Sequence, residues 1–182
     1  NLPAELKKYR VYAVAFVDWT GSGWLDLFVT TFNHGNFLIR NQGGKFSSTL
    51  EPMPNGKGIL TVSPTIGAFG KDGSLGVFNG NMALGVISAF NRYGDGRRNS
   101  LTLKTPTGLV EHMMTELDGE TMASLASDFN GDGLTDVYFG NDFIVPDHLF
   151  LGQADGTLAP APEALRQRLA TPFFSMSIDT GD

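Results

Sequence analysis

The residues with the clearest capacity for chemistry lie in one glycine-rich stretch, residues 128–136. Its oxygen donors are four side chains and one main-chain carbonyl: Asp128, Asn130, Asp132, Asp136 and the carbonyl of Leu134. Alternate side chains of a tight loop converge on one point, and Gly131 and Gly133 let the backbone fold back. An all-oxygen set with three carboxylates suits Ca²⁺ at about 2.3–2.6 Å, whereas zinc and copper favour His or Cys.

This stretch is not an EF-hand, because that motif needs a bidentate Glu at its twelfth position and here that position is Phe139. Small and apolar residues lead into the loop from Met122, and β-favouring residues lead out of it as far as Gly140. A metal-free Asx/Gly turn is the alternative interpretation. The strand-like flanks favour a calcium loop that joins two β-strands.

A second stretch, residues 18–26, has the same spacing of oxygen donors. Those donors are Asp18, Thr20, Ser22, Asp26 and the main-chain carbonyl of Trp24. Only two of them are carboxylates, so the sequence predicts weaker calcium binding here, because affinity follows ligand charge. The alternative is a metal-free turn in which Thr20 and Ser22 bond their own backbone.

Two further stretches align with these loops. In the one that contains Asp72, the other ligand positions are Ala68, Gly70 and Gly76, and a single carboxylate does not hold calcium. The last one ends on Asp182, which stands at the first ligand position of a possible next site. The four stretches begin at positions 18, 68, 128 and 182, at intervals of 50, 60 and 54 residues. Intervals of this size, with about four short strands each, are typical of β-propeller blades.

The sequence therefore predicts an all-β fold of propeller blades, each a four-stranded antiparallel sheet, over the single unit 1–182. Blades are expected to begin near residues 11, 62, 122 and 176, which gives about three blades and the first strand of a fourth. Because a propeller needs 4–8 blades to close, we expect a fragment of a longer chain. One short helix is expected near 162–170, and a loop or helical turn at 111–116. Residues 84–90 and 101–103 are expected as outer strands of the second blade.

Composition and the absence of certain motifs argue against several classes of function. The net charge is −6 and no Lys/Arg stripe is present, which argues against a nucleic-acid partner. No apolar run reaches the ~18 residues of a membrane span, and the absence of Cys excludes a disulfide scaffold. The sequence has no G-x-S-x-G, phosphate-loop or H-E-x-x-H motif, so we expect a protein that is not an enzyme.

Residues 126–137, and less closely residues 14–28, resemble the FG-GAP/VCBS repeat family, the calcium-loop blades of integrin α-subunit propellers. Residues 141–157 resemble more narrowly the ASPIC/UnbV branch of cartilage-acidic-protein type. The resemblance implies a seven-bladed propeller that is secreted, periplasmic or at the cell surface, with Ca²⁺ in its loops. It implies roles in adhesion, assembly or protein–protein interaction rather than catalysis. This sequence departs from the family in the poor ligand set around Asp72 and in lacking the tail that names the branch.

Two other functions are open at this point. A lectin-like module would bind a glycan, and Trp19 and Trp24 exposed together beside a groove would favour it. An accessory propeller of an enzyme whose catalytic part is not in this chain would be supported by a pocket that gathers Asp142, Asp147 and His148. The leading interpretation is a calcium-binding module for a protein partner or for a larger extracytoplasmic assembly.

Overall fold

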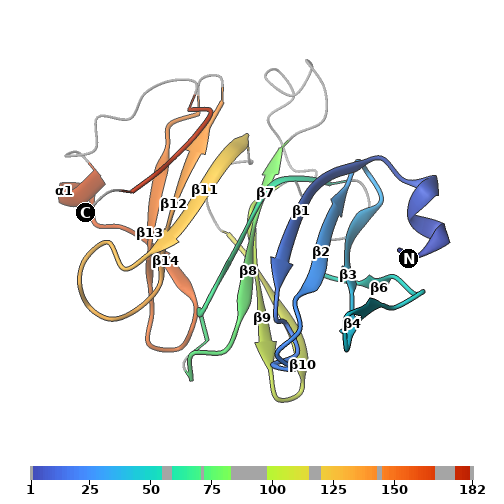
Figure 1. Cartoon of the computed structure of the whole chain (residues 1–182). Coiled ribbons are helices and arrows are strands. Elements are labelled where there is room, and N and C mark those ends of the chain that lie inside the picture. Colours follow the sequence, from blue (N-terminus) through green and yellow to red (C-terminus); the bar gives the residue numbers. More distant parts are fainter. Residues whose placement is uncertain are drawn as a thin grey trace.

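The computed structural model describes residues 2–54, 59–70, 72–82, 98–114, 120–142, 145–166 and 175–180. Three four-stranded antiparallel sheets stand side by side, in chain order from right (blue) to left (orange) in Figure 1, together with a small two-stranded hairpin. The all-β prediction is confirmed at this level, and the assignment of these sheets as propeller blades stays a prediction. Within the described ranges, no helix is long and apolar enough to cross a membrane.

The first sheet has the strand order β1-β2-β3-β6. Its strands are β1 (Val11–Val17), β2 (Asp26–Thr31), β3 (Gly35–Ile39) and β6 (Glu51–Pro52). A 3-10 helix, η1 (Ala4–Lys8), precedes β1. The hairpin of β4 (Asn41–Gln42) and β5 (Lys45–Phe46) separates β3 from β6.

The middle sheet has the order β10-β9-β8-β7. Its strands are β7 (Leu60–Gly67), β8 (Gly76–Met82), β9 (Ser100–Thr105) and β10 (Gly108–Met113). The strand expected at 101–103 is confirmed within β9, but it is not an outer strand, because β9 pairs with β8 on one side and β10 on the other. Residues 84–90 lie outside the described residues. The loop or helical turn expected at 111–116 is wrong for residues 111–113, because they pair with β9 in the ladder Glu111–Thr102 to Met113–Ser100.

The third sheet has the order β11-β12-β13-β14. Its strands are β11 (Thr121–Ser127), β12 (Asp136–Asn141), β13 (His148–Gly152) and β14 (Leu158–Pro160). The helix expected near 162–170 appears as one turn, α1 (Glu163–Arg166), and residues 167–170 lie outside the described residues. The first strands of the three sheets begin within two residues of the predicted starts at 11, 62 and 122.

Strand β8 of the middle sheet is buried on both faces, and its adjacent residues, which point in opposite directions, pack against different sheets. Val77 packs toward the first sheet with Phe28 and Leu38. Phe78 packs toward the third sheet with Phe139, and the two ring centroids lie 5.2 Å apart. Both residues of this β8 pair are fully buried. The apolar run of the strand is therefore explained by neighbours on both sides.

Buried polar side chains also connect the sheets, near the starts of β7 and β11. Asn36 Nδ2 donates to Thr61 Oγ1 at 2.9 Å, from the first sheet to the middle one. Asn99 Nδ2 donates to Thr121 Oγ1 at 2.9 Å, from the middle sheet to the third. We call Asn36, Thr61, Asn99 and Thr121 the polar seam. All four side chains are almost fully buried, so their hydrogen bonds hold the junctions in one register.

A similar contact lies beyond the third sheet. Ser175 Oγ donates to Asp147 Oδ2 at 2.6 Å, and Ser175 N donates to Asn141 O at 3.0 Å. The expected first strand of a fourth blade is not formed by residues 175–180, because this single backbone bond is too little for a strand ladder. Asp182, the possible next site, lies outside the described residues.

Candidate functional site

The loop at 128–136 joins β11 to β12 and is closed by backbone N–H groups that converge on Asp128. Its Oδ1 accepts from Gly131 N at 2.8 Å and from Asp132 N at 3.1 Å, and its Oδ2 accepts from Gly133 N at 2.8 Å. Gly131 and Gly133 have φ of 78° and 85°, in the left-handed region that glycine adopts without strain. The spacing therefore folds into the tight turn that the sequence predicted.

The last ligand position of this loop is a fully buried carboxylate. Asp136 is 0 % exposed, and its Oδ2 accepts from Phe129 N and its Oδ1 from Gly152 N, each at 2.8 Å. Asn130 and Asp132 lie exposed between the two ends, and Asn130 Nδ2 donates to Asp132 Oδ2 at 2.8 Å. The loop thus presents exposed carboxylates at Asp128 and Asp132 above a buried one at Asp136.

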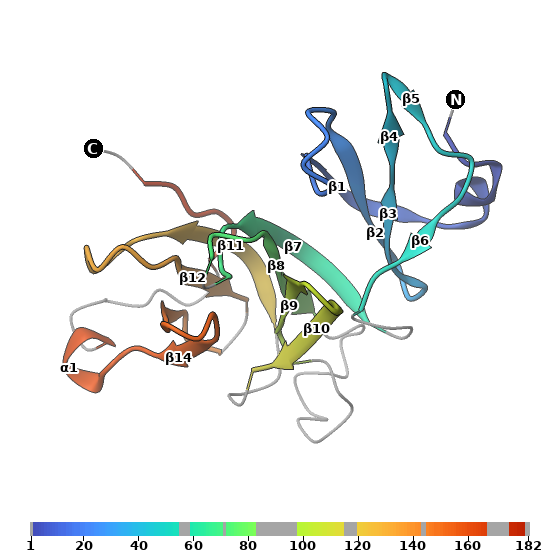
Figure 2. The same ribbon diagram turned by 90° about the horizontal axis from the view of Figure 1, so that it is seen from below.

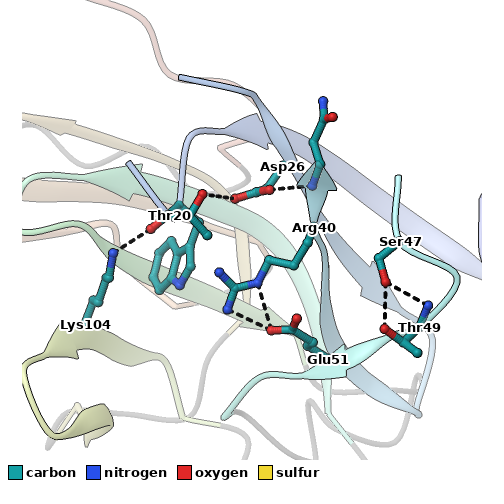
Figure 3. Close-up of polar contacts among 9 residues, drawn as sticks. Thr20, Asp26, Arg40, Ser47, Thr49, Glu51 and Lys104 are labelled. Atoms are coloured by element: carbon teal, nitrogen blue, oxygen red, sulfur yellow. Dashed lines mark hydrogen bonds and ion pairs between the residues drawn. The ribbon is translucent and has the colours of Figure 1, made fainter. Parts of the chain in front are cut away.

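The loop at 18–26 joins β1 to β2 and repeats these hydrogen bonds. Asp18 Oδ1 accepts from Ser22 N at 2.9 Å and its Oδ2 from Gly23 N at 2.7 Å. Asp26 is fully buried, and its Oδ1 accepts from Asn41 N at 2.7 Å, just after β3. In the same way, Asp136 Oδ1 accepts from Gly152 N, at the end of β13. Thr20 Oγ1 lies 3.4 Å from Asp26 Oδ2 (Figure 3). The two loops therefore share one architecture with different ligand types.

The stretch around Asp72 keeps one turn of this architecture. Asp72 Oδ1 accepts from Ser74 N at 3.0 Å, as Asp132 Oδ1 accepts from Leu134 N at 2.8 Å. Gly73 has a φ of 76°, close to that of its counterpart in the loop at 128–136. The Asp72 carboxylate is the only acidic group at the aligned ligand positions, so this stretch keeps the turn but lacks the ligands of a cation site.

Hydrogen-bond donors of the loops control the acidity of the Asp18, Asp72 and Asp128 carboxylates. The N–H of Gly133 is the largest influence that lowers the pKa of Asp128 below its ordinary value of 3.8, and Gly23 does the same for Asp18. For Asp72, the Ser74 hydroxyl is the main cause of a lowered pKa. A hydrogen bond to the charged form favours ionisation. All three groups are therefore anionic at neutral pH.

This lowered pKa predicts a pH-dependent contribution of Asp128 to stability. Its folded pKa lies below its unfolded value, so its stabilising contribution is complete above about pH 4 and is lost as the pH falls through the folded pKa. We expect the gap in unfolding free energy between the wild type and Asp128→Asn, measured by urea titration in chelator, to shrink below about pH 4. A gap of constant size from pH 7 to pH 3 would contradict this assignment.

By donor chemistry the two loops fit a hard cation, since every candidate ligand atom is oxygen. In the part of the chain that the structure describes, however, no group of three His, Cys, Asp or Glu side chains is gathered as a ready metal cage. The carboxylates instead accept backbone N–H bonds, and Asn130 presents its amide nitrogen to Asp132. Calcium binding would require that amide to present its oxygen.

A hollow of about 390 Å³ lies between the loop at 18–26 and the turn at Asp72. Asp18, Asp72 and Lys104 line it. Lys104 Nζ donates to the main-chain oxygen of Trp19 at 2.7 Å, which ties β9 to the first sheet (Figure 3). The loop at 18–26, the turn at Asp72 and the loop at 128–136 all leave their sheets at the same end, the lower end in Figure 1. Tertiary packing therefore puts acidic side chains from two sheets beside one another.

The two tryptophans are not exposed together. Trp19 is 3 % exposed and belongs to the core, whereas Trp24 is 48 % exposed. Trp24 lines a second hollow, of about 410 Å³, with Arg40 and Glu51, which form an ion pair of 2.8 Å (Figure 3). The paired-tryptophan surface expected of a lectin is therefore absent, and Trp24 remains beside a polar hollow.

Asp142, Asp147 and His148 do not converge on a common point. The His148 ring packs against Phe139 with centroids 5.4 Å apart. Asp147 Oδ2 instead accepts from Tyr138 Oη at 3.1 Å and from Ser175. Burial, and then the Asp147 charge, raise the pKa of Tyr138 to about 12. Asp147 thereby holds Tyr138 and Ser175 in place beside β12 and β13.

Sequence reasoning missed the polar seam. A signal for it, and for the similar contact of Ser175 with Asp147, was present: Thr61, Thr121 and Ser175 each stand one residue before a predicted blade start at 62, 122 or 176. A hydroxyl side chain at the same distance before each blade start indicates a shared structural role. The partners of these three hydroxyls, Asn36, Asn99 and Asp147, could not be assigned without the strand register.

No family model matches the chain, and no curated protein sequence matches it significantly. The FG-GAP/VCBS resemblance therefore rests on the loop residues themselves. It stays a prediction.

Proposed function

We propose that this chain is a non-catalytic, calcium-binding module of the FG-GAP/VCBS type, which serves protein–protein interaction, adhesion or assembly outside the cytoplasm. The observation that carries the proposal is the shared architecture of the loops at 18–26 and 128–136. In each loop the first Asp, half-buried at Asp18 and exposed at Asp128, closes the turn and a buried Asp ends it. Such a pair of acidic loops, at the same end of the first and third sheets, fits a role for a hard cation.

The residues that would hold calcium are those of the two loops. In the first they are Asp18, Thr20, Ser22, the Trp24 carbonyl and Asp26; in the second they are Asp128, Asn130, Asp132, the Leu134 carbonyl and Asp136. When bound, calcium supplies positive charge that offsets the repulsion between the carboxylates. The loop at 128–136 has more charge and is the tighter site. Affinities of extracellular calcium modules, about 10⁻⁴–10⁻³ M, suit the loop at 18–26.

An exposed apolar face supports the interaction role. Tyr12, Val14 and Phe16 of β1 are 49, 49 and 64 % exposed. They alternate with Ala15 and Val17, which pack toward the middle sheet. A run of large apolar side chains on one face of a strand is typical of a surface that another protein covers.

A glycan is the second candidate ligand. The observation that favours it is Trp24, half exposed beside Arg40, Asn41 and Glu51 in the hollow of about 410 Å³. An aromatic wall with a few convergent polar groups is a common form of small-ligand site. The protein-binding role ranks first, because the second tryptophan that a lectin-like surface was expected to use is buried.

Calcium titration tests the proposal. We expect isothermal calorimetry of the whole chain to show saturable binding of one or two ions, and the melting temperature to rise in calcium relative to chelator. Magnesium at the same concentration serves as the control, since it demands a smaller, more regular site. Absence of both saturable heat and a melting shift would overturn the calcium assignment.

A further inference from the structure

The outermost strand of the middle sheet, β10, has a free edge. In the described part of the chain, β10 pairs only with β9, and Figure 2 shows it at the rim of its sheet. Leu109, Val110 and Met113 of this strand are 36, 40 and 43 % exposed. Among the described residues, no strand pairs with the outer backbone N–H and C=O groups of β10, which is the condition for adding a strand there.

The three sheets differ in how their outer edges are protected. The outer strand β6 has two residues and contains Pro52, and β14 has three and ends on Pro160. Short strands and proline both block the addition of a further strand. By contrast, β10 has six residues, Gly108–Met113, with neither Pro nor Lys among them. Among the three described outer strands, β10 is the one that has neither of these protections.

One face of β10 is turned toward the first sheet. Leu109 pairs with Lys104, whose Nζ bonds to the main-chain oxygen of Trp19. Leu109 also lines a hollow of about 310 Å³ with Leu38 and Met53, between β10 and β6. Because strand residues alternate, Glu111 and Met113 share the face of Leu109. An added strand would present alternate side chains to this face.

Glu111 lacks a partner on that face. Its Oε1 is buried and, in the part of the chain that the structure describes, accepts no hydrogen bond. A buried carboxylate oxygen without a donor is costly, so a cation that reaches it from an added strand gains a strong, charge-assisted bond. This orphan oxygen gives the edge a chemical preference for a basic side chain.

We propose that β10 receives an extended segment of a protein partner as a fifth strand. The segment would place a basic side chain against Glu111 and an apolar side chain against Leu109 at the hollow. Main-chain bonds would supply affinity and these two alternate positions would supply specificity. The proposal rests on the proposed role as an interaction module and names the kind of partner.

A designed peptide tests this edge. The probe is a fluorescein-labelled, end-blocked peptide, Thr-Val-Thr-Lys-Thr-Val-Thr, whose symmetric pattern fits either strand direction. Fluorescence anisotropy would be measured against the whole chain. We expect saturable binding that weakens at least about tenfold when the peptide Lys is replaced by Glu, or when its outward amides are N-methylated.

Two protein variants locate the contact. Glu111→Gln keeps the side-chain shape and should weaken peptide binding about tenfold, and Leu109→Lys should do the same by charge repulsion. Glu5→Gln, an equal charge change on the exposed η1, should leave it unchanged. No saturable binding of the Lys peptide, equal binding of the Glu peptide, or equal losses for Glu111→Gln and Glu5→Gln would each overturn the proposal. Calcium titration of the same sample reports separately on the proposed function.

Discussion

Asp132→Ala should remove calcium binding at the loop 128–136, while Asp72→Ala should leave calcium binding unchanged. Asp132 is exposed, and its structural bonds are local ones to Leu134 N and to the Asn130 amide. Its loss removes one of three carboxylates from the loop, and affinity follows ligand charge. Asp72 occupies the matching position of a turn without other acidic ligands.

The size of this effect follows from linkage. At a free calcium concentration of 100 times the dissociation constant, one bound ion stabilises the folded chain by about 2.7 kcal/mol. We expect Asp132→Ala to lose that increment. Its melting temperature should then rise in calcium relative to chelator only by the amount that an ion bound at 18–26 contributes. Calorimetry should show one ion fewer.

The matched pair of variants makes the test decisive. Both substitutions replace an exposed Asp that accepts a hydrogen bond from the N–H two residues later. A general effect of charge or of turn stability would therefore appear in both. Equal losses of calcium binding in Asp132→Ala and Asp72→Ala would contradict the assignment of the loop at 128–136.

Thr121→Val should destabilise the chain by about 3 kcal/mol, through the polar seam. Thr121 is fully buried; its hydroxyl accepts from Asn99 Nδ2 and donates to Asn141 Oδ1, each at 2.9 Å. Val has nearly the same shape but no hydroxyl, so two buried polar groups lose their partner. Each unsatisfied buried group costs about 1–3 kcal/mol.

Thr121→Ser is the control, because it keeps the hydroxyl and removes one methyl group. Its expected cost is about 1 kcal/mol, the burial energy of that methyl group. Urea unfolding at pH 7 would measure both variants. A Val variant as stable as the Ser variant would show that the seam hydrogen bonds contribute nothing net. A larger loss for Val would show that they hold the third sheet to the middle one.

The loops and the polar seam lie at opposite ends of the sheets. The loops leave at the lower end in Figure 1, while Thr61 and Thr121 stand at the opposite ends of β7 and β11. A loop variant should therefore change calcium response with little effect on the junctions. A seam variant should lower stability in calcium and chelator alike, since sites this far apart are nearly additive.

The sequence by itself determined the local features. The Asp–Gly spacing of residues 128–136 sets the turn, because the N–H groups that close it are within five residues of Asp128. The strands that flank the loops follow from short runs of β-favouring residues between glycine-rich turns. These signals depend on neighbours in the chain, and each could be read without a tertiary structure.

Only the tertiary structure decided which surfaces are covered. Trp19 and Trp24 lie in one loop region, yet packing against the middle sheet buries the first and leaves the second half exposed. The strand at 108–113 forms because β9 pairs with it, although its local pattern gave little sign of a strand. The orphan oxygen of Glu111 follows from that pairing. Such features depend on residues distant in the chain, whose register a single sequence does not specify.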